Sequence, residues 1–386
     1  MKKLACAFLA FAFVLDLAVY MALSRVSVST NAFYTLDDKS DALSVDSRVY
    51  TYLEMEKLLY KFIEKYFIGK NGEVYTRVQS PGGDMSTLSE SIGLLMAYGV
   101  LTDKKDLFDR EFAFLKNHLL VENSFIKWRT GGLPKATCNA AIDDLRIIRA
   151  LLDAHERWGG RDYLRTADRL QKSFYENQAK NGVLTELYDW AAGEGKNSIP
   201  LCYIDLYTLY RMTGLDERWR EISDNGLRII KGGSLDKTSP FFYKYYDIQR
   251  DSYSKDEEYA KSREICITYA AYTALHMAEA NEDTECFKSW LKKEMDNGRL
   301  YAWYHPDTLK PSRDAESTAV YALSAMYAQK AGERELCHRL LDKMLQFMVT
   351  DPDSRYYGGF GSQQTGEFYS FDNLTALLAL AEAAGQ

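Results

Sequence analysis

Apolar residues recur at helical spacing along most of the chain from about Val49 onward, whereas the strict alternation that would indicate strands is hard to find. The pattern predicts twelve helices, and several of them end at glycines such as Gly214 and Gly332. The predicted helices cover residues 50–67, 87–102, 104–120, 140–158, 161–179, 200–213, 215–230, 262–280, 283–295, 315–331, 333–348 and 371–385. We therefore expect an all-α protein.

The links between the predicted helices alternate between short and long. Each even-numbered helix is followed by a link of a few residues, as at Gly159-Gly160, and is preceded by a link of roughly 12 to 30 residues. Even-numbered helices begin roughly every 50 to 60 residues, which indicates about six helical hairpins in tandem. Six hairpins can either stack into an open solenoid or close into a ring.

The two sets of helices differ in how their apolar residues are distributed. Even-numbered helices are apolar on nearly every face, as in LTALLALAEAA at 374–384, whereas odd-numbered helices carry a one-sided apolar stripe, as in MEKLLYKFIEKYF at 55–67. This difference predicts an (α/α)6 barrel, with the even helices in the inner ring and the odd helices in the outer ring. All long links then meet at one rim, at the N-termini of the inner helices, where function is expected.

The long links are rich in aromatic residues, and the chain as a whole is 13% aromatic with 28 Tyr. Aromatic rings suit the flat faces of sugars, so we favour a sugar-binding groove over simple packing of the loops. The residues of these links that we predict to contact a substrate are Trp128, Tyr188, Trp190, Trp303 and Tyr369.

Carboxylates stand at the starts of two predicted inner helices and in one long link. The acids are Glu90 in STLSESIGLL, Asp143 and Asp144 in AAIDDLRIIRALL, and Asp247 in the Tyr-rich link FFYKYYDIQRDSY. An acid in the first turn of a helix also suits the helix dipole, so a structural role is the alternative. Converging carboxylates in an aromatic groove are what glycosidic cleavage needs, because one acid protonates the leaving oxygen while another activates water.

The helix dipole opposes a catalytic role for Glu90, because it lowers the pKa of a carboxyl group at a helix N-terminus. A proton donor that works near neutral pH needs a raised pKa. We therefore expect burial and a neighbouring Asp144 to raise the pKa of Glu90. The sequence has no spacing typical of a phosphate-binding loop, a Cys-His pair or a metal site, so we expect neither a cofactor nor a metal.

Three short motifs resemble those of glycoside hydrolase family 8, whose members are inverting enzymes built on an (α/α)6 barrel. The motifs are STLSES, AAIDDLRIIRALL and YDIQR, and the similarity spans about residues 50–386. The resemblance implies that Glu90 is the proton donor, that Asp247 is the general base and that Asp144 supports distortion of the sugar ring. It also implies that Tyr246 and Arg250 are neighbours of the base, and Tyr246 is a further candidate for stacking on a sugar.

The chain departs from the family's motifs at three positions. Ile142 and Arg146 stand where the second motif has Asp, and Ser91 stands where the first has Gly. These departures indicate a divergent branch that acts on a substrate other than plain cellulose. We expect an endo-acting, inverting hydrolase of a β-linked, β-1,4 polysaccharide such as a bacterial exopolysaccharide. Asp251 and Asp372 remain alternatives as the general base.

Other functions of the same architecture are kept as alternatives. Sugar epimerases of this fold rely on histidines that line the barrel, whereas here His118, His155 and His338 fall on predicted outer helices. An unsaturated uronide hydrolase would use chemistry led by Asp. A non-catalytic glycan-binding helical protein would keep the aromatic rings and lose one of the acids.

The N-terminus is separate from the predicted barrel. Residues 1–32 read as a signal peptide or signal anchor, because Lys2 and Lys3 precede a run that is apolar up to Leu23 except for Asp16. Residues 33–48 are a predicted linker, and residues 49–386 form the predicted catalytic domain. We therefore expect an extracytoplasmic protein, either secreted or tethered to the outer face of the cytoplasmic membrane.

Charge and cysteine content limit which partners and which disulfide bonds the chain is expected to have. The formal net charge of −7 argues against a nucleic-acid partner, because contact with phosphates needs a basic face. We expect a polysaccharide as the partner and a monomeric chain. The cysteines that follow the signal segment are odd in number and lack CxxC spacing, so we expect core packing rather than a disulfide framework.

Overall fold

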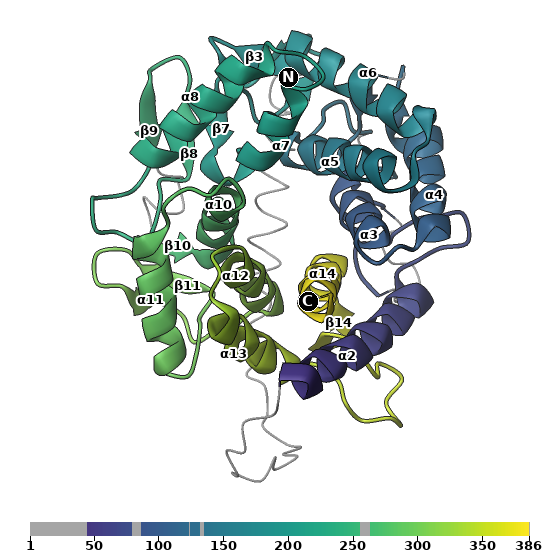
Figure 1. Cartoon of the computed structure of the whole chain (residues 1–386), viewed down its shortest axis with the longest axis vertical. Coiled ribbons are helices and arrows are strands. Elements are labelled where there is room, and N and C mark those ends of the chain that lie inside the picture. The colour runs from purple at the N-terminus through teal and green to yellow at the C-terminus, as the bar shows by residue number, and fades with distance from the viewer. Residues whose placement is uncertain (1–44, 79–85, 123, 132–134, 255–262, 386) are drawn as a thin grey trace.

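The helices form two concentric rings (Figure 1). The computed structural model describes residues 45–78, 86–122, 124–131, 135–254 and 263–385. The predicted signal segment, and the predicted linker up to residue 44, lie outside the described residues.

Within these residues the chain forms twelve α-helices, which correspond in order to the twelve that the sequence predicts. The inner helices are α3 (Ser89–Leu101), α5 (Ala141–Trp158), α7 (Leu206–Met212), α10 (Ile267–Glu279), α12 (Thr318–Lys330) and α14 (Ser370–Ala384). The outer helices are α2 (Val45–Tyr66), α4 (Lys105–Phe114), α6 (Arg161–Gln178), α8 (Trp219–Gly232), α11 (Glu285–Asp296) and α13 (Arg334–Leu345). The outer helix α4 continues as a π-helical turn over Leu115–Leu119.

The ring closes where the last inner helix meets the first. Helix α14 packs against both α3 and α2, and the Oγ atoms of Ser370 and Ser91 lie 3.1 Å apart. The predicted (α/α)6 barrel is therefore confirmed, and the open solenoid is not formed.

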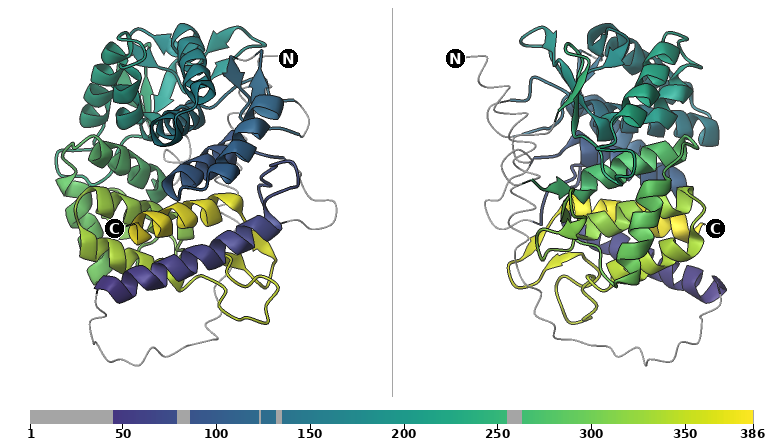
Figure 2. Two further views of the ribbon diagram at one scale, coloured as in Figure 1. Left: turned by 45° about the vertical axis from the view of Figure 1, so that its right-hand side comes forward. Right: turned by 90° about the vertical axis from the view of Figure 1, so that its left-hand side faces the viewer.

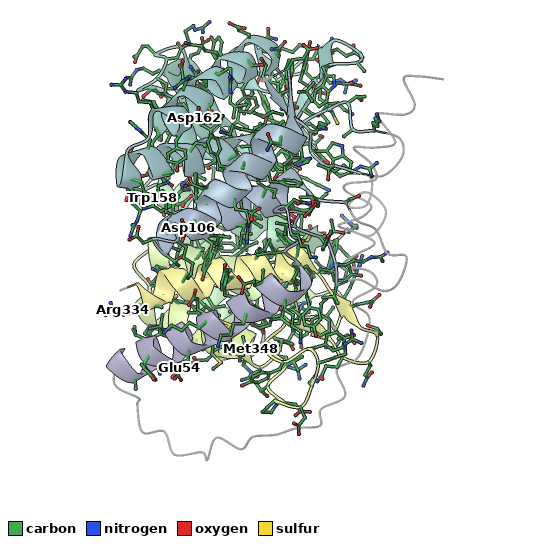
Figure 3. All side chains as sticks on the ribbon, turned by 90° about the vertical axis from the view of Figure 1, so that its right-hand side faces the viewer. Glu54, Asp106, Trp158, Asp162, Arg334 and Met348 are labelled. Atoms are coloured by element: carbon green, nitrogen blue, oxygen red, sulfur yellow. The ribbon has the colours of Figure 1, made fainter. Side chains whose placement is uncertain are left out.

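Burial explains why the two rings have different sequences. Inner helix α12 is buried at every position from Ala319 to Ala328, because it is covered by neighbours on all sides. Outer helix α6 buries one stripe that includes Tyr163 and Phe174. Figure 3 shows Glu54 and Asp106 on the outside of the ring, where both are exposed. In the part of the chain that the structure describes, no helix is both long and apolar enough to cross a membrane.

The sixth predicted helix, over 200–213, is broken in the structure. A 3₁₀ turn over Leu201–Tyr203 is followed by the short helix α7. The break occurs because Asp205 caps α7, accepting a hydrogen bond of 3.0 Å from the backbone N–H of Thr208.

Short antiparallel strands occupy the long links, where the sequence shows no clear alternation. The pairs are β1 (Leu120–Val121) with β2 (Phe125–Ile126), β3 (Ala179–Lys180) with β4 (Val183–Leu184), β5 (Tyr188–Asp189) with β6 (Glu194–Gly195), and β13 (Gly361–Ser362) with β14 (Glu367–Phe368). The three-stranded sheets are β7 (Ser198–Pro200), β8 (Tyr245–Asp247) and β9 (Ser252–Ser254), and β10 (Ile265–Cys266), β11 (Trp303–His305) and β12 (Lys310–Pro311). The right-hand view of Figure 2 shows strands gathered at one end of the barrel. This end is the rim, at which the inner helices begin.

Candidate active site

Glu90 lies in the first turn of α3, at the rim. The start of this helix is held by the neighbouring link, because the carbonyl of Trp128 accepts hydrogen bonds from the backbone N–H of Ser89 (3.0 Å) and from its hydroxyl (3.2 Å). Leu88, the residue before the helix, is extended and forms a β-bridge with Arg129. These backbone contacts fix the position from which Glu90 projects.

Asp143, in the first turn of α5, is the carboxylate next to Glu90. It is only 1% exposed and accepts two hydrogen bonds of 2.7 Å, one from Ser89 Oγ and one from Arg146 Nη1, on different oxygens. The backbone N–H of Glu90 also donates to it. Burial raises the pKa of Asp143, while Arg146 and these hydrogen bonds act in the opposite direction and favour the ionised form.

Burial raises the pKa of Glu90 to about 8, and the negative charge of Asp143 adds to this effect while Arg146 opposes it. No described side chain donates a hydrogen bond to the Glu90 carboxylate. Glu90 therefore carries a proton near neutral pH, as a general acid must. Desolvation overcomes the helix dipole as expected, but the neighbouring charge comes from Asp143 and not from the predicted Asp144.

Asp144, the next residue of α5, has different partners from Asp143. It accepts a hydrogen bond of 2.5 Å from Asn139 Nδ2, and Asn139 also donates to Gln178 at the end of α6. Burial raises the pKa of Asp144 well above its usual range. Successive residues of a helix point about 100° apart, so only one of the two adjacent acids can face Glu90. The structure gives that place to Asp143.

Arg146 and Tyr272, which the sequence did not indicate as site residues, lie beside the two acids. We define the rim cluster as Glu90, Asp143, Arg146 and Tyr272. Arg146 lies on the same face of α5 as Asp143 and its side chain is 13% exposed. It also hydrogen-bonds to Tyr272 on inner helix α10. The spacing of three residues between Asp143 and Arg146 could have indicated this pair, because residues three apart are neighbours on a helix.

Asp247 lies at the rim on β8, on the opposite side of the ring from α3 (Figure 1). It accepts hydrogen bonds from the backbone N–H groups of Arg250 (2.9 Å) and Gln249 (3.0 Å) and from Arg250 Nη1 (3.0 Å). The backbone N–H of Arg250 and its guanidinium lower the pKa of Asp247, which is therefore ionised at neutral pH. Arg250 is 81% exposed, so it orients the carboxylate from the solvent side.

Tyr246 faces away from Asp247, because successive residues of a strand point to opposite faces. Its side chain is 3% exposed, and its hydroxyl donates to Asp251. The ring packs against Tyr253. We therefore regard Tyr246 as a support for β8 and not as a stacking residue. Asp251 accepts this hydrogen bond from Tyr246 on the face of β8 that is turned away from Asp247. Asp251 is therefore a poor substitute for Asp247 as the general base.

Asp372, the other alternative base, lies in the first turn of α14. It accepts a hydrogen bond of 3.2 Å from the backbone N–H of Ala319 at the start of α12. Burial raises the pKa of Asp372 to about 7. A general base should be fully ionised at the working pH, so this side chain suits the task less well than Asp247.

Three of the predicted aromatic residues are partly exposed and remain open to a ligand. Tyr188 and Trp190 are partly exposed, and both stack on Phe125, at centroid distances of 5.4 and 5.6 Å. The backbone of Tyr188 exchanges hydrogen bonds with Asn139, so these stacked rings lie beside the start of α5. Tyr369, just before α14, is also partly exposed.

The two other predicted tryptophans are more enclosed. Trp128 and Trp303 are buried, and a guanidinium lies over each ring, that of Arg129 at 4.8 Å and that of Arg313 at 4.2 Å. One face of each ring is therefore already covered by a cation. Any contact with a sugar would involve the remaining edge or face.

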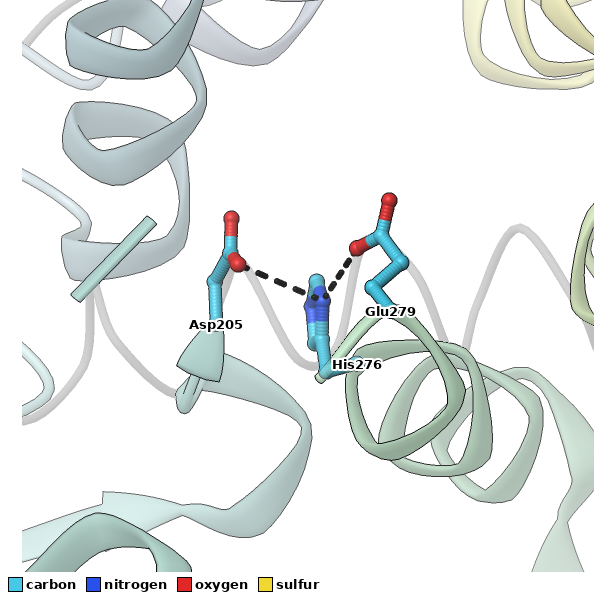
Figure 4. A group of neighbouring side chains, drawn as sticks. All are labelled: Asp205, His276 and Glu279. Atoms are coloured by element: carbon cyan, nitrogen blue, oxygen red, sulfur yellow. Dashed lines mark ion pairs between the residues drawn. The ribbon is translucent and has the colours of Figure 1, made fainter. Parts of the chain in front are cut away.

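A second polar cluster lies further along the barrel axis, and we call it the deep cluster: Asp205, His276, Glu279 and Arg149. Figure 4 shows His276 between the two carboxylates, with its Nδ1 atom 3.5 Å from Glu279 Oε2 and 3.8 Å from Asp205 Oδ1. Among the described residues, this is the one group whose ligand atoms are close enough to share a metal ion. Arg149 binds both oxygens of Glu279, at 2.8 and 3.0 Å. Because the Arg149 guanidinium already engages both oxygens of Glu279, we assign no metal here.

Comparisons with known proteins agree with the family that the sequence motifs predict. Residues 43–238 match the family described as "Glycosyl hydrolases family 8". The protein YdaJ of Bacillus subtilis (strain 168), whose name describes it as a lipoprotein, is 31% identical over 299 residues, or 76% of this chain and 78% of that protein.

Solved structures also match. One described as a novel alpha-amylase from Clostridium perfringens is 32% identical, with a TM-score of 0.79, and the match covers 85% of this chain and 97% of that one. PssZ from Listeria monocytogenes is 23% identical, with a TM-score of 0.69 and coverage of 84% of this chain and 94% of that chain. The second match supports the fold.

Proposed function

Because the chain belongs to glycosyl hydrolase family 8, we propose that it cleaves internal β-linked bonds of a polysaccharide with inversion at the anomeric carbon. The protein is a glycoside hydrolase, and membership of this family disfavours an epimerase, a uronide hydrolase or a non-catalytic glycan-binding protein. We favour a β-1,4-linked bacterial exopolysaccharide as the substrate, because Ile142 and Arg146 depart from the family's usual motif.

Each carboxylate has a proposed role. Glu90 protonates the glycosidic oxygen, Asp247 takes a proton from the attacking water, and Asp143 hydrogen-bonds the distorted sugar in place of the predicted Asp144. The observation that carries this proposal is the opposite direction of two pKa shifts, since the pKa of Glu90 is raised and that of Asp247 is lowered. Inversion requires the two carboxyl groups to be roughly 6.5–9.5 Å apart, so that a water molecule fits beside the sugar.

The proposal is tested with the variant Glu90→Gln, which keeps the shape of the side chain and removes the proton donor. We expect kcat/KM to fall by about 10³-fold or more, with the far-UV circular dichroism unchanged. Glu111→Gln is the matched control, because Glu111 is a buried glutamate on outer helix α4 whose pKa is also raised by burial, to about 7. If Glu90→Gln retains the activity of the parent enzyme, Glu90 is not the proton donor.

The substrate itself is identified by a panel of polysaccharides assayed for new reducing ends and, by NMR, for the anomeric configuration of the first product. The panel includes an α-1,4-glucan, because the relative from Clostridium perfringens is described as an alpha-amylase. Cleavage of an α-linked glucan alone would replace our first candidate with this second one. Retention of configuration would exclude the proposed pair of acid and base.

We also propose that the protein acts outside the cytoplasm, tethered by residues 1–32 or released after their removal. The charged and apolar pattern of this segment supports the proposal, and the related protein YdaJ is described as a lipoprotein. Fractionation of cells that produce the full chain tests it. Recovery of the protein in the cytoplasmic fraction alone would contradict it.

A further inference from the structure

Arg146 occupies the interior of the barrel directly beside the proposed proton donor. Its guanidinium contacts Asp143 at 2.7 Å and also Tyr272 of α10, so it extends from α5 across the inner space. Asp143 in turn accepts hydrogen bonds from Ser89 and from the backbone N–H of Glu90. The contacts therefore form a chain from α10, through Arg146 and Asp143, to the turn that carries Glu90.

The path of the Arg146 side chain depends on a glycine of the facing helix. A Cβ atom added at Gly93 would lie 3.1 Å from Arg146 Cδ and 3.3 Å from its Cγ, and also 3.2 Å from Ile147 Cγ1, all closer than ordinary contact. Gly93 is three residues after Glu90 on the same helix, so the arginine passes one turn below the carboxyl group. Helices α3 and α5 thus leave a space that is shaped for this side chain.

We propose that Arg146 is a positioning residue that keeps Asp143 ionised and fixed beside Glu90, so that Glu90 alone holds the proton of the rim cluster. This inference rests on the proposed function. It assigns a role to a residue that replaces an acid of the family's usual motif.

The charges around Asp143 show why a cation is needed there. The titratable groups that face it come from α3, α5, α10 and the 3₁₀ turn before α7: Glu90, Asp144, Arg146, Tyr272 and Tyr203. Arg146 is the cation in this set. Without it, the buried Asp143 and the half-buried Glu90 would be two neighbouring carboxyl groups with no cation beside them, and such pairs share one proton instead of dividing the roles.

The experiment is a pH profile of kcat/KM for the purified full-length variant Arg146→Met. Loss of the cation raises the pKa of Asp143, so the acidic limb of the profile should move to higher pH by about one unit or more. At a pH on that limb, kcat/KM should fall about tenfold more than it does at the optimum. Arg146→Lys keeps the charge and should return the limb most of the way to its original position.

Arg149→Met is the matched control, because Arg149 lies three residues further along α5 and pairs with Glu279 in the deep cluster. It should lower stability and leave the position of the acidic limb unchanged. If Arg146→Met fails to fold, Gly93→Ala replaces it, since the added methyl group displaces the arginine and should move the limb in the same direction.

A uniform loss of kcat/KM at every pH, with the limb unmoved in Arg146→Met or in its replacement Gly93→Ala, would show that the arginine only supports the packing of α5 and would overturn the inference. That result is distinct from failure of the proposed function, which would appear as full activity in Glu90→Gln.

Discussion

The rim cluster and the deep cluster are built from similar parts and behave in opposite ways. Both lie inside the barrel, both contain an arginine of α5 and a side chain of α10, and both contain more than one carboxylate. In the deep cluster, Arg149 binds both oxygens of Glu279, so that the pKa of this carboxyl lies below its usual range although burial acts in the other direction. In the rim cluster the arginine binds Asp143, and Glu90 is left with a raised pKa.

The difference shows what separates a structural ion network from a reactive one inside the same barrel. A carboxylate that is matched by a bidentate arginine stays ionised and holds two helices together. A carboxyl group that is desolvated beside another acid, with the cation directed at that neighbour, keeps its proton. The position of one guanidinium relative to two acids therefore decides which of them is available for proton transfer.

The largest effect that would sharpen this comparison is expected at the two adjacent acids of α5. Asp143→Asn should lower kcat/KM by about 10²-fold, because it removes the charge beside Glu90 and the proposed contact with the sugar. Asp144→Asn should cost less than about tenfold, because its side chain faces Asn139 and α6. Steady-state kinetics of both variants on one substrate measure the difference. The reverse order would restore the role that the sequence motif gave to Asp144.

This ambiguity marks the limit of what the sequence could predict about the site. The motif places Asp143 and Asp144 at the start of an inner helix, and that placement is confirmed. Which of two successive residues faces the barrel axis depends on the rotation of the helix, and a change of one residue turns a side chain by about 100°. Sequence spacing determines this rotation too loosely to choose between them.

The fold could be predicted more completely because its signal is spread over many residues. The contrast between all-round and one-sided apolar helices identified the inner and outer rings over the whole chain. Local exceptions were missed where a single side chain overrides the pattern, as Asp205 does when it interrupts the sixth predicted helix. Strands of two or three residues at the rim are too short to produce a visible alternation.

The deep cluster could not be predicted at all, because Arg149, Asp205 and Glu279 are far apart in the sequence and meet only when α5, α7 and α10 pack together. Glu279→Gln should lower the free energy of unfolding by about 3 kcal/mol, because it leaves the Arg149 guanidinium largely buried without its anionic partner. Urea denaturation measures the loss, and kcat/KM should stay within about twofold of the parent value.

A second variant separates the ion pair from other effects of the substitution. The double variant Glu279→Gln with Arg149→Met should lose less stability than the sum of the two single variants, because it leaves no unpaired buried charge. Strictly additive losses would mean that the two side chains do not stabilise each other. A large loss of activity in Glu279→Gln would place the deep cluster in the catalytic machinery and end the contrast with the rim.

The smallest expected effect is a difference in how stability depends on pH. The pKa of Glu90 is about 8 in the folded protein, above the ordinary value of 4.5, so its ionisation disfavours the folded state increasingly as pH rises between these values. Glu90→Gln removes this cost and should raise Tm relative to the parent at pH 9, with little change at pH 5.

Glu279 behaves in the opposite sense: its lowered pKa stabilises the fold at pH values above the ordinary pKa of a glutamate, and that contribution is lost as pH falls. Glu279→Gln should therefore lower Tm at pH 7 and approach the parent in acid. Thermal unfolding of both variants across this range would show divergent trends, and parallel curves would mean that the two carboxyl groups do not differ in protonation as the structure indicates.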